Sequence, residues 1–174
     1  MSDLKVSEIK TDTIKNQAGT SALSINSAGV ATTGVKHAFY MYRNATQTIT
    51  NGAGPVLIQF DASRINEGNG VTLGASARYT VPAGAGGIYV LHAHGRFNSG
   101  TDGNCSIGIF INGSGAATSY YYNGYYDGMN VTVLRSLSAT DYVEMKMANS
   151  VGNNLNIGGT DAGDNVFCWG YRLG

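Results

Sequence analysis

Charged residues are scarce in this chain. They make up 13% of the 174 residues, whereas an average globular domain has about 25%. Eleven basic residues balance eleven acidic ones, so the formal net charge at pH 7 is zero. No long-range field would concentrate phosphates or anionic lipids around such a protein, and we therefore expect no nucleic-acid partner.

Long apolar runs are also missing. No stretch approaches the roughly 18 apolar residues of a membrane span, and the first residues lack the apolar core of a signal peptide. We therefore expect neither membrane insertion nor Sec export. The two cysteines, Cys105 and Cys168, are too few for a disulfide framework and too far apart for a CxxC metal pair. We expect buried free thiols, with a disulfide as the alternative.

Glycine is abundant, with 25 residues, while proline occurs twice. From residue 37 onward, short segments rich in apolar residues are divided by Gly, Asn and Ser, and none shows a sustained period of 3.6. The candidate strands are 38–43, 55–61, 71–73, 76–81, 87–97, 104–111, 117–122, 129–136, 141–149, 154–157 and 165–173. About ten short strands predict an all-β sandwich of the jelly-roll type in one domain, residues 37–174.

Residues 1–36 have a different character. Their apolar residues are spaced among Ser, Thr, Asn and Gly without a helical stripe, and they offer too little apolar surface for a separate core. The Leu-Lys-Val-Ser-Glu-Ile-Lys-Thr opening is similar to the N-terminal attachment and stalk segments of bacteriophage fibre proteins. This resemblance implies an extended, β-rich anchor that binds other virion proteins. The attachment candidates are Leu4, Val6, Ile9 and Ile14.

An ordered set of motifs marks the second part of the chain. The motifs occupy residues 54–61, 65–68, 79–82, 87–91, 109–113, 137–143 and 167–173. In this order and spacing they resemble the C1q/TNF-like jelly-roll family, from residue 38 to residue 174. The resemblance implies a threefold assembly, and hence a homotrimer. The chain departs from the family at Thr140-Asp141, where the family usually has Gly-Asp.

Tyrosines cluster in one short segment. Five of the eleven tyrosines fall within seven positions, on both sides of Asn123-Gly124. They are Tyr120, Tyr121, Tyr122, Tyr125 and Tyr126. Strand alternation can bury only some of these rings, so the others lie exposed or at an interface. Packing between trimer subunits is one interpretation, and a platform for a host glycan or protein receptor is the other.

Two histidines, His92 and His94, share one strand face with Arg96. Zinc would need a third ligand, and the remaining histidine is His37. We therefore favour a polar strand face at a subunit contact over a zinc site.

Acidic residues lie mostly beside glycines in predicted loops. Asp102, Asp161 and Asp164 could supply part of the six to eight oxygen ligands of a calcium ion. Their spacing matches no known calcium loop, and Asp next to Gly is ordinary turn chemistry. We expect no metal or other cofactor, with calcium as the alternative.

Catalytic motifs are missing from the sequence: it contains neither Gly-x-Ser-x-Gly, nor a phosphate loop, nor His-Glu-x-x-His. We expect a protein that is not an enzyme. The favoured hypothesis is a trimeric, fibre-like structural protein of a phage virion, with an attachment segment and a head that contacts the host surface. The alternatives are a capsid decoration protein and a free carbohydrate-binding module, although a free module has no need of a 36-residue leader.

Overall fold

Two units make up the chain, residues 1–36 and residues 37–174, and we call the second one the head. The computed structural model describes residues 37–98, 103–122, 128–159 and 165–173 with their side chains, and the main chain of 13–15, 21–25 and 31–33. Within these residues no helix is long and apolar enough to cross a membrane.

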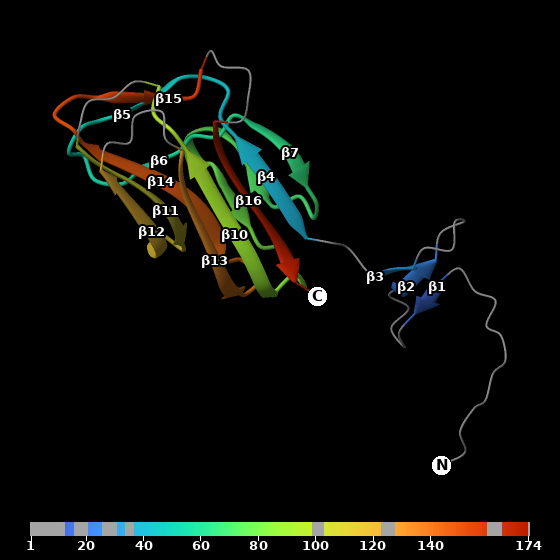
Figure 1. Cartoon of the computed structure of the whole chain (residues 1–174). Coiled ribbons are helices and arrows are strands. Elements are labelled where there is room, and N and C mark those ends of the chain that lie inside the picture. The colour runs from blue at the N-terminus through green and yellow to red at the C-terminus, as the bar shows by residue number, and fades with distance from the viewer. Residues whose placement is uncertain are drawn as a thin grey trace, which may run out of the picture. The chain divides into compact units, whose positions relative to one another are not determined.

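The first unit contains a small antiparallel sheet (Figure 1). Its strands are β1 (Thr13–Lys15), β2 (Ser21–Ile25) and β3 (Ala31–Thr33), in that order across the sheet. Ile14 lies in β1, opposite Leu23 of β2. The other attachment candidates, Leu4, Val6 and Ile9, lie outside the described residues.

The head is a sandwich of two sheets (Figure 1). The five-stranded sheet has the order β13 (Met129–Leu137), β10 (Gly87–Gly95), β16 (Val166–Leu173), β4 (Ala38–Tyr42) and β7 (Ala62–Asn66). The six-stranded sheet has the order β12 (Ser114–Tyr122), β11 (Asn104–Ile111), β14 (Tyr142–Ser150), β9 (Arg78–Thr80) and β8 (Val71–Thr72), with β6 (Val56–Leu57) paired to β14. Strands β5 (Gln47–Ile49) and β15 (Leu155–Ile157) form a separate pair.

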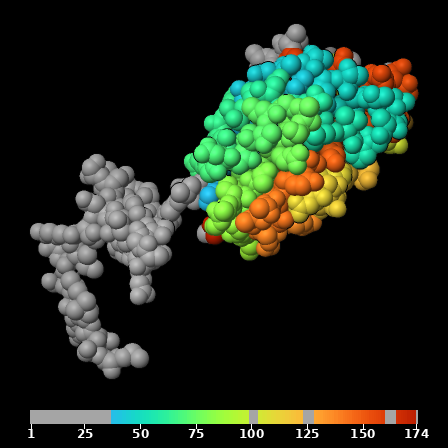
Figure 2. All heavy atoms as spheres, turned by 180° about the vertical axis from the view of Figure 1, so that it is seen from behind, coloured from blue at the N-terminus to red at the C-terminus, as the bar shows by residue number. Residues whose placement is uncertain are grey.

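The core lies between the two sheets, because successive side chains of a strand point to opposite faces. Both sheets contribute fully buried side chains, including Leu91 from β10 and Ile107 from β11. Figure 2 shows the sandwich from behind, where atoms of β14 (orange) lie beside the yellow atoms of the β11–β12 hairpin. The predicted all-β sandwich is confirmed, with more short strands than the ten or so expected.

One predicted strand is wrong. The segment 55–61 forms only the two-residue strand β6, and a strand that was not predicted, β7, follows it. Just after β6, main-chain groups bond to a side chain instead of a neighbouring strand: the Gln47 side-chain amide donates to the Leu57 carbonyl and accepts from the Gln59 amide. These contacts hold the segment in an irregular path and interrupt the ladder.

Two turns meet beside β11 and β14, where the Asn112 side chain donates to the Asp141 carboxylate and accepts from the Tyr142 amide. Asn112 and Gly113 have φ values of 51° and 79° and join β11 to β12, as the two-residue turns of hairpins require. In the second turn, the Ser138 carbonyl accepts from the Asp141 amide, and Thr140 has φ of 75°. Glycine is favoured at such a position, so Thr140 holds a backbone conformation that would suit the glycine of the family's Gly-Asp pattern.

Replacing Thr140 by glycine tests whether the positive φ at this position strains the folded chain. A β-branched residue with positive φ costs about 1–3 kcal/mol, whereas the extra freedom of glycine in the unfolded chain costs about 0.4–1 kcal/mol. Thr140→Gly should therefore raise the free energy of unfolding by about 1 kcal/mol, measured by urea denaturation. The control is Thr80→Gly in β9, where glycine should lower it. A lower stability for Thr140→Gly would contradict the assignment.

Candidate functional site

Strand β10 points different kinds of side chain to its two faces. Tyr89, Leu91 and Ala93 are buried in the core. The other parity carries Ile88, Val90, His92 and His94 to the outer face of the five-stranded sheet. The histidines are therefore on the face opposite the core.

Strand β16 places its small residues inside and its large rings outside. Cys168 and Gly170 face the core, while Phe167, Trp169 and Tyr171 face outward. A Cβ atom on Gly170 would lie 2.7 Å from both Leu91 Cδ2 and Phe39 Cε1. No side chain fits at that position, so the core side of β16 is already filled by its neighbours.

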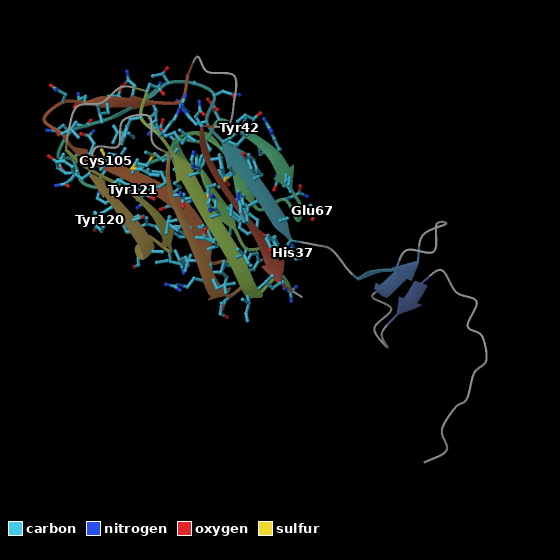
Figure 3. All side chains as sticks on the ribbon, in the orientation of Figure 1. His37, Tyr42, Glu67, Cys105, Tyr120 and Tyr121 are labelled. Atoms are coloured by element: carbon cyan, nitrogen blue, oxygen red, sulfur yellow. The ribbon has the colours of Figure 1, made fainter. Side chains whose placement is uncertain are left out.

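The outward rings form a continuous surface in which neighbouring rings stack, except that the Tyr40 and Tyr42 rings are tilted with centroids 6.2 Å apart. Its members are Tyr40, Tyr42, His92, His94, Phe167, Trp169 and Tyr171, and we call this set the aromatic face. Ring centroids are 5.3 Å apart for Tyr40 and Phe167 and 5.1 Å apart for His92 and Trp169. Phe167 also stacks on His94 at 4.9 Å. The Arg64 guanidinium covers one end, 5.1 Å from the Tyr42 ring centroid; Figure 3 labels Tyr42 near the end of β4.

An exposed apolar patch continues the aromatic face. Ile88 pairs with Leu173 across the β10–β16 ladder, and Leu134 lies on β13 at the other side of β10. Ile88 is 52% exposed and Leu134 is 56% exposed. The outward positions of β13, β10, β16 and β4 carry no carboxylate in the described residues. This face is thus apolar, aromatic and almost free of charge.

Both histidines of the aromatic face favour the neutral state. Burial lowers the pKa of His92. Burial also lowers the pKa of His94, and the nearby His92 and Arg96 charges lower it further. The His92 ring nitrogen Nδ1 lies 2.7 Å from the Thr132 hydroxyl. A neutral imidazole can make this bond and stack on apolar rings, so the face stays uncharged near neutral pH.

The tyrosine cluster divides as strand alternation demands. Tyr120 and Tyr122 project from β12 with exposures of 79% and 74%, whereas Tyr121 packs against the core. The Tyr121 hydroxyl donates to the Asn130 carbonyl and accepts from the Asn130 amide. Figure 3 shows Tyr120 and Tyr121 on β12, near Cys105 of β11. Tyr125 and Tyr126 lie outside the described residues.

The calcium candidates Asp102, Asp161 and Asp164 also lie outside the described residues. In the parts of the chain that the structure describes, no three His, Cys, Asp or Glu side chains come together. Cys105 and Cys168 are buried free thiols, as predicted, and burial raises the pKa of Cys168 to about 12. Such a thiol is unreactive, because the thiolate is the nucleophile.

The sequence interpretation missed most of the aromatic face. It identified His92 and His94 as an outward pair, but it did not place Tyr40, Phe167 or Trp169 beside them. The available signal was the alternation in residues 167–171, where large rings alternate with Cys and Gly. That alternation shows two faces, and the excess of rings on one face suggests a surface for contact.

Comparison with solved structures identifies the fold of the chain. No family model matches the chain, and no curated protein matches it in sequence. The globular domain of zebrafish complement 1qA protein is 13% identical with a TM-score of 0.56, covering 80% of this chain and 98% of that one. Murine APRIL, in a structure at pH 8.5, is 12% identical with a TM-score of 0.57, covering 79% and 99%. The chain therefore has the C1q/TNF-like jelly-roll fold.

Removing the Tyr121 hydroxyl should weaken the contact between β12 and β13. Tyr121→Phe leaves the Asn130 amide and carbonyl without their partner, and the free energy of unfolding should fall by about 1 kcal/mol. Tyr122→Phe is the matched control, because its hydroxyl is on the exposed side of the same strand and its removal should be neutral. Equal stability of the two variants would show that the Tyr121 bonds contribute nothing.

Stability should depend on pH through the two outward histidines. Because their pKa values are lower in the folded protein, the unfolded chain binds more protons below about pH 6.5. The free energy of unfolding should be at its full value above that pH and should fall as the pH drops through the folded pKa values. Denaturation curves at fixed protein concentration measure this, with the double variant His92→Gln, His94→Gln as control. A wild-type chain as stable at about pH 5 as at about pH 8 would contradict it.

Proposed function

We propose that this protein is a trimeric, fibre-like structural protein of a phage virion, in which residues 1–36 attach to the particle and the head contacts the host surface. It is a binding protein without catalysis. The observation that carries the self-association is the aromatic face with its apolar patch.

Self-association follows from what the aromatic face lacks. A monomer would expose stacked rings, Ile88 and Leu134 on one side of a sheet that has hardly any charge to keep other molecules away. A second copy offers the same chemistry, since no like charges oppose each other across the contact. Around a threefold axis the aromatic faces of three copies would all turn toward one another and leave no open end, whereas an unclosed arrangement would grow into filaments. The resemblance to the C1q/TNF-like family favours three copies over an isologous pair.

The N-terminal unit supports the attachment role. Its described strands are three to five residues long, and the sequence around them contains few apolar residues. A three-stranded sheet of this size needs an additional packing partner to be stable. Copies of the chain in a trimer, or a neighbouring virion protein, would supply one. The similarity of residues 1–36 to phage fibre stalks favours the virion.

The trimer is tested by placing one charge on each outer face of the sandwich. The full chain should have a light-scattering mass about three times the 18.2 kDa chain mass. Tyr171→Arg, on the aromatic face, should lower the mass, because a buried guanidinium without a partner costs several kcal/mol. Tyr120→Arg, on the other sheet, should leave the mass unchanged. A monomeric wild-type chain, or a trimer that tolerates Tyr171→Arg, would refute the proposed interface.

The attachment role is tested by deleting residues 2–34. The head has its own core, so circular dichroism of the deletion variant should keep its β spectrum, and the variant should fail to join the particle. Variants with serine at Leu4, Val6 and Ile9 should show the same loss if these side chains make the contact. Incorporation of the deletion variant at the wild-type level would exclude the leader as the attachment segment.

A further inference from the structure

A groove of about 320 Å³ opens on the outer side of the six-stranded sheet, on the opposite layer from the aromatic face. Its floor comes from outward positions of β11 and β14, among them Ser106 and Ala148, which are neighbours across the ladder. Tyr120 of β12 stands beside Ser106 and bounds one side. The turn containing Pro55 bounds the other. A volume of this size is at the lower end of small-ligand sites, about 300–1,000 Å³.

Small residues make the groove. Serine and alanine on the floor leave space that larger side chains would fill, and the flanking turn contains Gly52 and Gly54, where an added Cβ would meet nothing within 4 Å. Both glycines have positive φ values, 68° and 77°, so the turn keeps its shape only with residues that tolerate this conformation. The turn that bounds the groove therefore stays free of bulky side chains because its backbone conformation favours glycine.

The polar groups of the groove are uncharged. Its lining contains no Asp, Glu, Lys, Arg or His. In the described part of the chain, the side-chain amide of Asn104 and the hydroxyls of Ser106 and Tyr120 make no hydrogen bond, and the Ser150 hydroxyl donates to the Asn104 carbonyl. These free donors and acceptors point to a partner with hydroxyl or amide groups, since a charged partner would lose its hydration without gaining a counter-charge.

The Tyr120 ring supplies the apolar part of recognition. It is 79% exposed and belongs to a strand held in place by Tyr121, so binding costs little ordering of the ring. A sugar ring presents a C–H face to such an aromatic surface and hydroxyls at its edge, which matches a ring beside amides and hydroxyls. A flat aromatic ligand would leave the Asn104 and Ser106 groups unpaired, and that would cost affinity.

We propose that this groove binds one or two residues of a neutral saccharide, stacked on Tyr120 and hydrogen-bonded by Asn104 and Ser106. The inference rests on the proposed role of the head in surface contact, and it gives that role a ligand class and a site. In a trimer built through the aromatic face, the groove stays on the outer layer and is repeated three times. Weak single-site binding would then be strengthened by multivalency.

The test uses the full chain labelled with ¹⁵N and titrated with neutral disaccharides (lactose, cellobiose and chitobiose) and with sialyllactose as the charged probe. At least one neutral disaccharide should shift the amide signals of Ser106, Ala148 and Ser150 at millimolar concentration. Tyr120→Ser should weaken this binding about tenfold or more, and Tyr120→Phe should keep it within about threefold. Tyr122→Ser is the matched control, because Tyr122 is exposed on the same face of β12 but does not line the groove.

Filling the floor gives a second variant. Ser106→Leu places a larger side chain in the groove and should abolish the shifts while the β spectrum is unchanged. The inference is overturned if no neutral disaccharide binds, if the shifts map elsewhere, if Tyr122→Ser loses as much affinity as Tyr120→Ser, or if sialyllactose binds the groove more tightly than lactose. Light-scattering mass is recorded on every sample. A trimer without saccharide binding refutes only the groove, whereas a monomer that binds saccharide refutes the proposed trimer and leaves the groove standing.

Discussion

Aromatic rings pack between the two sheets of the head. Because these rings face inward, the alternate residues of their strands face outward. Phe39 of β4 stacks on Tyr79 of β9 with centroids 4.2 Å apart, and Tyr79 contacts Tyr89 of β10 at 6.2 Å. Burial raises the pKa of the Tyr79 hydroxyl far above its usual range, and the adjacent Tyr89 adds to the shift. Gly70 and Gly170 make room for these rings, since a Cβ on either would lie within 2.7 Å of a ring atom.

With these rings inside, strand alternation sends the neighbouring residues outward, and the two layers acquire different surfaces. The five-stranded sheet presents stacked rings and aliphatic side chains without a carboxylate, which suits contact with another copy of the chain. At the groove, the six-stranded sheet presents small uncharged residues beside the Tyr120 ring, which suits a small neutral ligand. We therefore propose that one layer serves assembly and the other serves recognition.

The sequence predicted the all-β sandwich, the strand boundaries to within a few residues for most strands, and the burial of only some of the clustered tyrosines. These features depend on local alternation and on turn residues such as Asn112 and Gly113. The aromatic face was not predicted as a surface, because alternation shows that residues 167–171 have two sides but not which side meets the core. The groove could not be predicted either, since Pro55 and Tyr120 are brought together only by the pairing of β6, β14, β11 and β12.

Trp169 reports directly on the proposed burial of the aromatic face between subunits, because the chain contains one tryptophan. Acrylamide quenching of its fluorescence measures how accessible the indole is to solvent. Quenching in the full chain at micromolar concentration should be clearly weaker than in the Tyr171→Arg variant, and dilution that dissociates the trimer should raise it to the level of the variant. Equal quenching in the wild-type chain and the variant at every concentration would show that the aromatic face is not buried between subunits.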